Sequence, residues 1–184
     1  MSIITKVIAR QVFDSRGNPT VEAEVFSKNI SSSSICPSGA STGSFEAYEK
    51  RDLNKKNYNG KSVFKAVKII NSTIAKKLKN QNVHNQEKID HILLKLDGTK
   101  QKTKLGANSM LSVSMAVKKL SSKIKKIPLY KNFLVKKNFS LPYPLMNIIN
   151  GGVHANNGLQ IQEFMIRPDG AKSFTQAIKM SFLV

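Results

Sequence analysis

The residues that could do chemistry gather in three short stretches, and the first is the loop "SGASTG", residues 38–43. Five of its six residues are Ser, Thr or Gly, so hydroxyl oxygens and flexible backbone are crowded together. Glycines let a backbone approach a ligand closely, and hydroxyl oxygens can bind a phosphate group or a divalent metal ion. This composition is typical of a phosphate cradle or a flexible lid, and a surface turn is the plain alternative.

The second stretch is "NGGVHANN", residues 150–157, which places His154 after two glycines at the end of a predicted strand. A lone histidine is usually a structural hydrogen-bonding group, but one at a glycine-hinged strand end is a better candidate for function. The third stretch is "IQEFMI", residues 161–166, where Gln162 and Glu163 interrupt an apolar strand. Buried Glu is rare unless it is paired or functional, and polar side chains at strand ends of an α/β barrel commonly point into a site.

Other possible phosphate-binding and metal-binding motifs are less convincing. "NGKS", residues 59–62, ends like a phosphate-binding P-loop, but Lys55 stands where that motif needs a glycine. Glu87 and His91 could share one helix face just after His84, yet two ligands do not make a metal site, and a solvated helix face is the simpler interpretation. The 11 acidic residues form no pair or triplet that converges on one site. A magnesium site built mainly from protein carboxylates is therefore not predicted.

Strands are predicted before helices. Residues 3–13 and 20–26 are predicted strands joined by the turn "DSRGNP", and residues 30–36 are a third strand rather than a serine-rich linker. Apolar residues then recur at spacings of three and four, as in amphipathic helices. These helical segments span residues 63–74, 89–96 and 113–124. The order predicts an α+β domain over residues 1–140, with helices on one side of a three-stranded antiparallel sheet.

The character of the sequence changes over residues 141–184. "LPYPLMNIING" and "IQEFMIRPDG" are predicted to be strands of a buried type, and a helix follows Ser173, with Gln176 at capping-box spacing. Two strands and one helix cannot bury a core alone. This segment is therefore interpreted as a second domain that is cut off soon after it starts.

The balance of 30 Lys and Arg against 11 Asp and Glu gives a net charge of +19, which suggests a nucleic-acid partner. The lysines, however, are spread from Lys6 to Lys179. The densest groups, "KKLKN" and "KKLSSKIKK", carry no interleaved aromatic residues on which bases could stack. Compositional drift, as in an AT-rich genome, is the favoured explanation, and nucleic acid is not the expected partner.

Cys36 is the only cysteine, so an internal disulfide is excluded and a reducing compartment is favoured. There is no apolar run of membrane-spanning length, and "MSIITKVIAR" lacks the features of a secretory signal. The sequence thus favours a protein of a reducing compartment without a membrane partner.

Together these segments resemble the enolase family, whose members catalyse the magnesium-dependent, reversible dehydration of 2-phosphoglycerate to phosphoenolpyruvate in glycolysis. The resemblance covers most of the chain but only the amino-terminal part of an enolase. It implies an α+β amino-terminal domain followed by the truncated start of an α/β, TIM-like catalytic barrel. The matching stretches, in the family's order and spacing, are "DSRGNPTVE", "PSGASTGSFEAYEKRD", "LDGT", "KLGANSMLSVSMAV", "PLY", "MNIINGGVHA" and "IQEFMIRPDGAKSF".

The resemblance also implies roles for individual residues. The "SGASTG" loop would be a mobile lid over the substrate, in which Ser41 ligates the second, catalytic Mg²⁺ and the backbone of Ala40 contacts the substrate. The loop that carries His154 would close over the substrate as well. Gln162 and Glu163 would line the pocket, with Glu163 supporting the acid side of the reaction, so that His154 and Glu163 are the predicted catalytic residues.

The same resemblance implies that other essential groups come from later barrel strands. These are the Lys base, the three carboxylates of the first magnesium site, the proton-donating Glu and the phosphate-binding Arg and Ser. This chain alone is thus expected to be inactive, and the full-length enzyme is expected to be a homodimer. Ser112 and Asn156 depart from the family's usual residues. The alternative is a non-catalytic remnant or a basic nucleic-acid-binding fragment.

Overall fold

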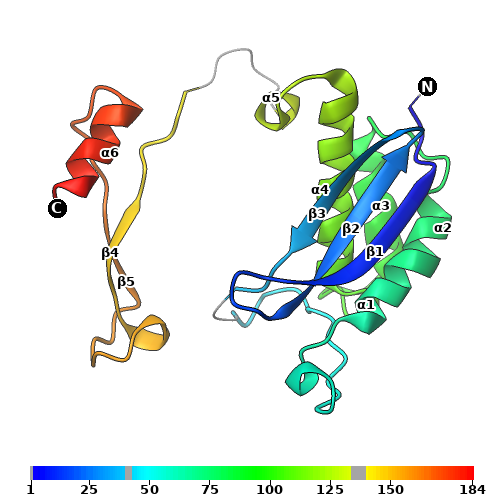
Figure 1. Cartoon of the computed structure of the whole chain (residues 1–184), viewed down its shortest axis with the longest axis horizontal. Helices are drawn as coiled ribbons and strands as arrows, with labels where there is room; N and C mark the ends of the chain where they lie inside the picture. Colours follow the sequence, from blue (N-terminus) through cyan, green and yellow to red (C-terminus); the bar gives the residue numbers. More distant parts are fainter. Residues whose placement is uncertain (1, 40–42, 134–139) are drawn as a thin grey trace. The chain divides into compact units, whose positions relative to one another are not determined.

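The computed structural model describes residues 2–39, 43–133 and 140–184, and the predicted site residues Ala40 and Ser41 lie outside these ranges. The chain divides into two compact units, Met1–Leu134 and Val135–Val184 (Figure 1).

The first unit contains a sheet of three antiparallel strands in the order β1-β2-β3. The strands are β1 (Lys6–Phe13), β2 (Pro19–Ser27) and β3 (Ile30–Cys36). The predicted turn between β1 and β2 forms around Asp14, whose carboxylate accepts hydrogen bonds from the backbone N–H groups of Arg16 and Asn18 at 2.9 Å each. The bond from Asn18 is the main reason why the pKa of Asp14 is lowered.

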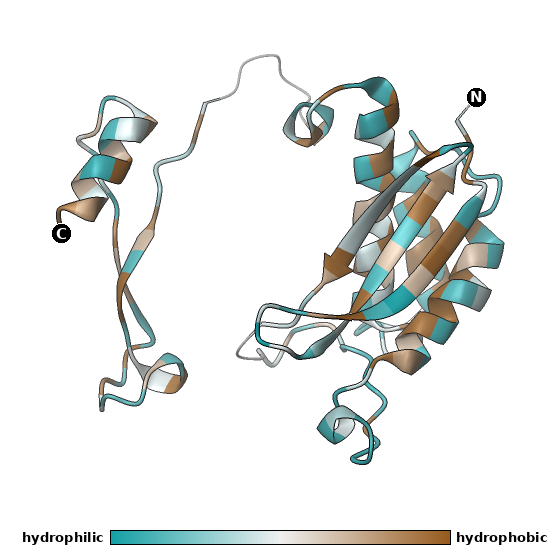
Figure 2. Cartoon of the chain, viewed as in Figure 1, coloured by the Kyte–Doolittle hydropathy of each residue, from teal (hydrophilic) through white to brown (hydrophobic). Residues whose placement is uncertain are grey.

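β2 has two different faces because its side chains alternate (Figure 2). Glu22 and Glu24 lie on one face, and both form ion pairs with Arg10 of β1, at 3.0 Å for Glu22. The residues between and beside them are fully buried on the other face. They are Val21, Ala23 and Val25. One face of the sheet is thus polar, and the other supplies the core.

Helices pack on the buried face (Figure 1). The helical elements of the first unit are η1 (Tyr58–Gly60), α1 (Phe64–Ile69), η2 (Ile70–Ile74), α2 (Ala75–Leu78), α3 (Gln86–Asp97), α4 (Ala107–Lys125) and α5 (Leu129–Phe133). Apolar residues from all three predicted helical segments are buried in the core. They include Val63, Ile70, Ile74, Ile89, Leu93, Val113, Val117 and Leu120. The predicted α+β fold of the first unit is confirmed.

Two features of the helices are the N-terminal cap of α3 and a π-helical turn between α1 and α2. Asn85 caps α3, since its side chain accepts a hydrogen bond from the backbone N–H of Lys88 at 3.0 Å. The turn η2 is π-helical, which the sequence did not predict, and it lies between α1 and α2 in one continuous helix. Asn71 in this turn accepts a hydrogen bond from the backbone N–H of Ala9 at 2.7 Å and donates one to its carbonyl at 3.0 Å. The backbone of Ala9 on the outer edge of β1 is thereby paired.

The outer edge of β3 is satisfied by lysines of α4. Lys119 Nζ donates to the carbonyl of Ser33 at 3.3 Å, and Lys123 Nζ donates to the carbonyl of Ser31 at 3.0 Å. Lys119 and Lys123 are four residues apart on one face of α4, and they reach Ser33 and Ser31, which are two residues apart on one side of β3. A charged side chain on an edge strand also discourages pairing with another chain.

The second unit contains β4 (Met146–Asn150), η3 (Gly152–His154), β5 (Glu163–Ile166) and α6 (Phe174–Phe182). β4 and β5 pair as antiparallel strands. The connection between them, residues 151–162, contains only the short turn η3, whereas parallel neighbours need a longer crossover connection. The prediction that these strands are of a buried type is wrong for this chain, because most of β4 and half of β5 are exposed. Two strands and one helix cover too little surface to enclose a core.

Candidate functional site

The first candidate region lies beside the hydroxyl-rich loop, where Ser38 is tied to the residues that follow the loop. Its Oγ lies 2.6 Å from one carboxylate oxygen of Glu49 and 2.7 Å from the other. Arg51 donates from Nη2 to Ser38 Oγ at 2.7 Å and to Glu49 at 2.8 Å, and from Nη1 to the carbonyl of Pro19 at 3.0 Å. A hydroxyl that donates to the carboxylate and accepts from the guanidinium is fully satisfied.

The segment after the loop is also joined to the start of α4. Asn108, which is 2% exposed, accepts a hydrogen bond from the backbone N–H of Lys50 and donates one to its carbonyl, both at 3.0 Å. Gly106 precedes it with a φ of +92°, and a Cβ atom there would lie 2.5 Å from the Cβ atom of Lys50. Only glycine allows this close approach.

A hollow of about 550 Å³ lies between this segment and α4. Its walls include Cys36, Ser38, Glu49, Asn108 and Leu111. Burial, with a smaller effect of the Glu49 carboxylate, raises the pKa of the Cys36 thiol, so the thiol stays protonated and weakly nucleophilic. The hollow is therefore a recess with mixed polar and apolar walls beside Ser38 and not a thiolate centre.

The second candidate region is in the second unit, where the structure brings together His154, Gln162 and Glu163. His154 Nδ1 lies 3.3 Å from Glu163 Oε1, and His154 Nε2 lies 3.0 Å from Gln162 Nε2. The side chains of His154 and Glu163 are 22% and 31% exposed. The carboxylate that interrupts an apolar strand therefore has a partner, in keeping with the rarity of unpaired buried Glu.

Two glycines make this cluster possible. Gly151 N–H donates to the carbonyl of Gln162 at 2.9 Å, and Gly152 N–H donates to the carbonyl of Leu159 at 2.7 Å. A Cβ atom on Gly151 would lie 2.3 Å from the carbonyl oxygen of Ile161, and Gly152 has a φ of +54°. Both positions thus need glycine for the chain to fold back and place the histidine beside the Gln-Glu pair.

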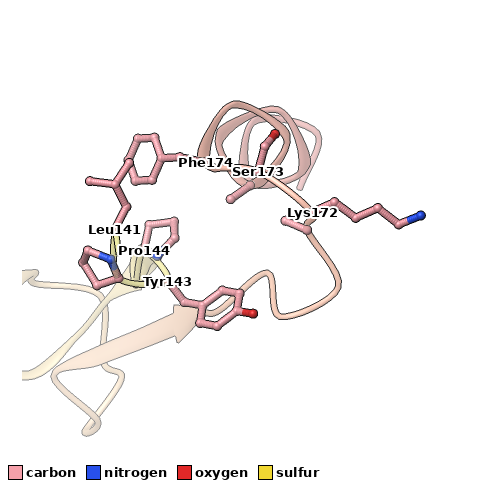
Figure 3. A pocket seen from close by; sticks show the side chains of 9 residues that line it. Leu141, Tyr143, Pro144, Lys172, Ser173 and Phe174 are labelled. Atoms are coloured by element: carbon pink, nitrogen blue, oxygen red, sulfur yellow. The ribbon is translucent and has the colours of Figure 1, made fainter. Parts of the chain in front are cut away.

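A separate hollow of about 170 Å³ in the second unit lies between residues 141–144 and the start of α6 (Figure 3). Leu141, Tyr143 and Pro144 line it from the extended segment, and Ser173 and Phe174 line it from the start of α6. The three residues of the histidine cluster do not line this hollow. It is a gap in the packing between a proline-rich segment and a helix.

The other ionisable candidates are dispersed. Among the described residues, there is no group of three or more His, Cys, Asp or Glu side chains that could hold a metal ion. Glu87 and His91 are exposed on α3, in agreement with a solvated helix face, and the exposed His84 has its Nδ1 2.9 Å from Ser121 Oγ. In the described ranges, no helix is long and apolar enough to cross a membrane.

Sequence analysis missed Glu49, Arg51 and Asn108. The charged run that follows the loop was a signal for the first two, because Glu49 and Arg51 are two residues apart just after it. Asn108 gave no such signal, since its burial and its contact with Lys50 depend on a pairing across 58 residues. Ala40 and Ser41 are outside the described residues, so their predicted roles remain predictions.

Two family models divide the chain between them. The model of the enolase N-terminal domain matches residues 4–133, and that of the enolase C-terminal TIM barrel domain matches residues 138–184. The chain belongs to the enolase family. The second unit is accordingly the start of the family's barrel domain, and β4 and β5 are its strands.

Individual enolases agree with this assignment. The enolase of Pelagibacter ubique (strain HTCC1062) is 67% identical over all 184 residues of this chain, and the enolase of Ehrlichia canis (strain Jake) is 52% identical over 97% of it. The chain spans 44% and 42% of the length of these two relatives. The similarity is thus to the first part of an enolase.

Proposed function

We propose that the protein acts as an enolase, a hydro-lyase that reversibly dehydrates 2-phosphoglycerate to phosphoenolpyruvate in glycolysis. Family membership supports the reaction class. The observation that carries the proposal is the cluster of His154, Gln162 and Glu163, because three polar side chains singled out in the sequence meet at hydrogen-bonding distance. The full-length enzyme is proposed to be a cytoplasmic homodimer.

In this proposal the side chains of the second unit bind and orient the substrate. His154 is placed on a glycine-hinged loop and contacts an anionic group of the substrate, while Gln162 and Glu163 line the pocket. Glu163 also holds the His154 ring through Nδ1, 3.3 Å away, which fixes the direction in which Nε2 points. The hydroxyl group that leaves the substrate must receive a proton from an acidic group. The Glu163 carboxylate supports this step by keeping negative charge near that proton donor.

Mg²⁺ is the proposed cofactor, and its chemistry would be to stabilise negative charge on the ene-diolate. The described residues of this chain do not form a site for it by themselves, since none of them cluster as a metal-binding group. Ser41, the predicted ligand, can offer only one oxygen, whereas Mg²⁺ prefers six. The other ligands are proposed to lie in the part of the relatives' length that the chain does not span.

The basic, nucleic-acid-binding alternative is weakened by what the lysines contact. In the densest lysine group, residues 118–126, four of the five lysines have partners within the first unit. The pairs are Lys118 with the Phe133 ring, Lys119 with Ser33, Lys123 with Ser31, and Lys125 with Asn132. These contacts give the lysines roles within the first unit, which explain their presence without a phosphate-binding partner.

A chimera tests the proposed function directly. The chain would replace the matching 44% of the Pelagibacter enolase, to which it is 67% identical, and phosphoenolpyruvate formation would be followed by its ultraviolet absorbance. We expect an active chimera that needs Mg²⁺, whereas residues 1–184 alone should form no product. A Glu163→Gln chimera should lose about 10²-fold or more in kcat, as expected for a group in acid–base catalysis.

The control is Glu87→Gln in the same chimera, because Glu87 is exposed on α3 and its loss should leave kcat unchanged. A folded chimera without activity, beside an active Pelagibacter enzyme, would contradict the proposed function. Turnover by residues 1–184 alone would contradict the proposed division of the metal ligands. Salt-sensitive RNA binding by the chain would instead favour the basic alternative.

A further inference from the structure

Both ring nitrogens of His154 have partners. Nδ1 lies 3.3 Å from Glu163 Oε1, and Nε2 lies 3.0 Å from the side-chain nitrogen of Gln162. Glu163 is the charged group that the structure brings against the ring, from the first position of β5. Gln162 is the residue just before that strand. The two neighbours therefore reach opposite sides of one imidazole.

The chemistry of these groups determines where the proton sits. An ionised carboxylate can only accept a hydrogen bond, so His154 Nδ1 carries the hydrogen that lies between it and Glu163. An amide nitrogen can only donate, so His154 Nε2 offers its lone pair to Gln162. Both contacts select the same form of the ring, which is neutral and protonated at Nδ1.

We propose that Gln162 is a positioning residue that, together with Glu163, holds His154 in the Nδ1–H tautomer with Nε2 as an acceptor. The tautomer does not depend on any reaction, whereas its role in substrate binding rests on the proposed function. An anionic group of a substrate can only accept hydrogen bonds, so it can bind at Nε2 only after that nitrogen gains a proton.

Glutamine is suited to this position because its amide NH₂ can donate to the unprotonated Nε2. A glutamate at the same position could only accept, and a methionine could offer neither contact. Gln162→Glu and Gln162→Met therefore separate hydrogen bonding from side-chain length.

The test is ¹⁵N NMR of the histidine-labelled chain at about pH 8, above the ordinary titration range of imidazole. The chain has three histidines, so His84→Gln and His91→Gln variants assign the signals of the third. We expect a protonated, pyrrole-type Nδ1 and an unprotonated, pyridine-type Nε2 in His154. Solid-state spectra give the same information on precipitated protein.

The variants make the proposal falsifiable. Gln162→Glu should give a His154 ring protonated at both nitrogens at the same pH, because it then lies between two carboxylates, and Gln162→Met should shift only the Nε2 signal. Gln160→Glu is the matched control, since Gln160 is exposed and gains the same charge two residues away. A wild-type ring protonated at Nε2, or identical spectra for Gln162→Glu and the control, would overturn the proposal. An inactive chimera with the expected spectra would overturn only the proposed function.

Discussion

Asn108→Ala tests the junction between α4 and the segment that follows the hydroxyl-rich loop. Asn108 is 2% exposed and exchanges two hydrogen bonds of 3.0 Å with the backbone of Lys50. A net hydrogen bond contributes about 1 kcal/mol, and a buried group left without its partner costs about 1–3 kcal/mol. Because Lys50 is half-buried, water can partly replace the amide. We therefore expect the free energy of unfolding to fall by about 2–4 kcal/mol.

Urea unfolding followed by circular dichroism measures this change, with the slope m unchanged if only stability is affected. Asn108→Asp should lose at least as much, since a buried carboxylate is costly to desolvate and cannot donate to the Lys50 carbonyl. Asn29→Ala, in the exposed turn between β2 and β3, is the control and should change stability by less than about 0.5 kcal/mol. A loss for Asn108→Ala no larger than that of the control would refute the reasoning.

Three further predictions concern the first unit. Ser109→Ala should raise the free energy of unfolding by about 1 kcal/mol in urea, because the buried Oγ has no partner among the described residues. Burial and the nearby Lys125 lower the pKa of His84 in the folded state, so stability should be highest above about pH 6.5 and fall below it. Thermal unfolding at several pH values should show this fall, and His84→Gln should reduce it. The double variant Lys119→Ser, Lys123→Ser should associate more in light scattering than wild type, because the β3 edge loses its lysine donors.

Much of the first unit follows from local sequence. The alternation of Val21 to Val25 sets which face of β2 is buried, and Asn85 and Gly98 mark the two ends of α3. These features depend on neighbours within a few residues, and such signals are readable without knowledge of the fold. The predicted strands, helices and order of the first unit were therefore correct.

The edge contacts were not predictable in the same way. Asn71 bonds to Ala9 across 62 residues, and Lys119 bonds to Ser33 across 86. Nothing in the local pattern of either residue distinguishes it from a solvated helix residue. The π-helical turn and part of the lysine excess therefore acquire a structural reason only when the sheet edges are known.

The candidate site was predictable by residue type but not by contact. His154 and Glu163 attracted attention because a glycine pair and an apolar strand surrounded them. That they bond to each other depends on the tight reversal at Gly151, where any Cβ atom would collide with a backbone carbonyl. The glycines were interpreted as a hinge, whereas in the structure they also serve close packing.

Each candidate region lies within one unit and contains contacts over short stretches of chain, although the first region is also joined to the start of α4 across 58 residues. Gln162 lies eight residues from His154, and Glu49 lies 11 from Ser38. Closing loops of this length costs little entropy, so such contacts can form without a completed barrel. The side chains proposed to bind the substrate thus contact one another without a metal or substrate, which would reduce the cost of ordering them on binding. A substitution that breaks one of these local contacts leaves the side chains more mobile before the ligand binds. It should therefore weaken ligand binding, and more so the more contacts it breaks, even where the fold of the other unit is unchanged.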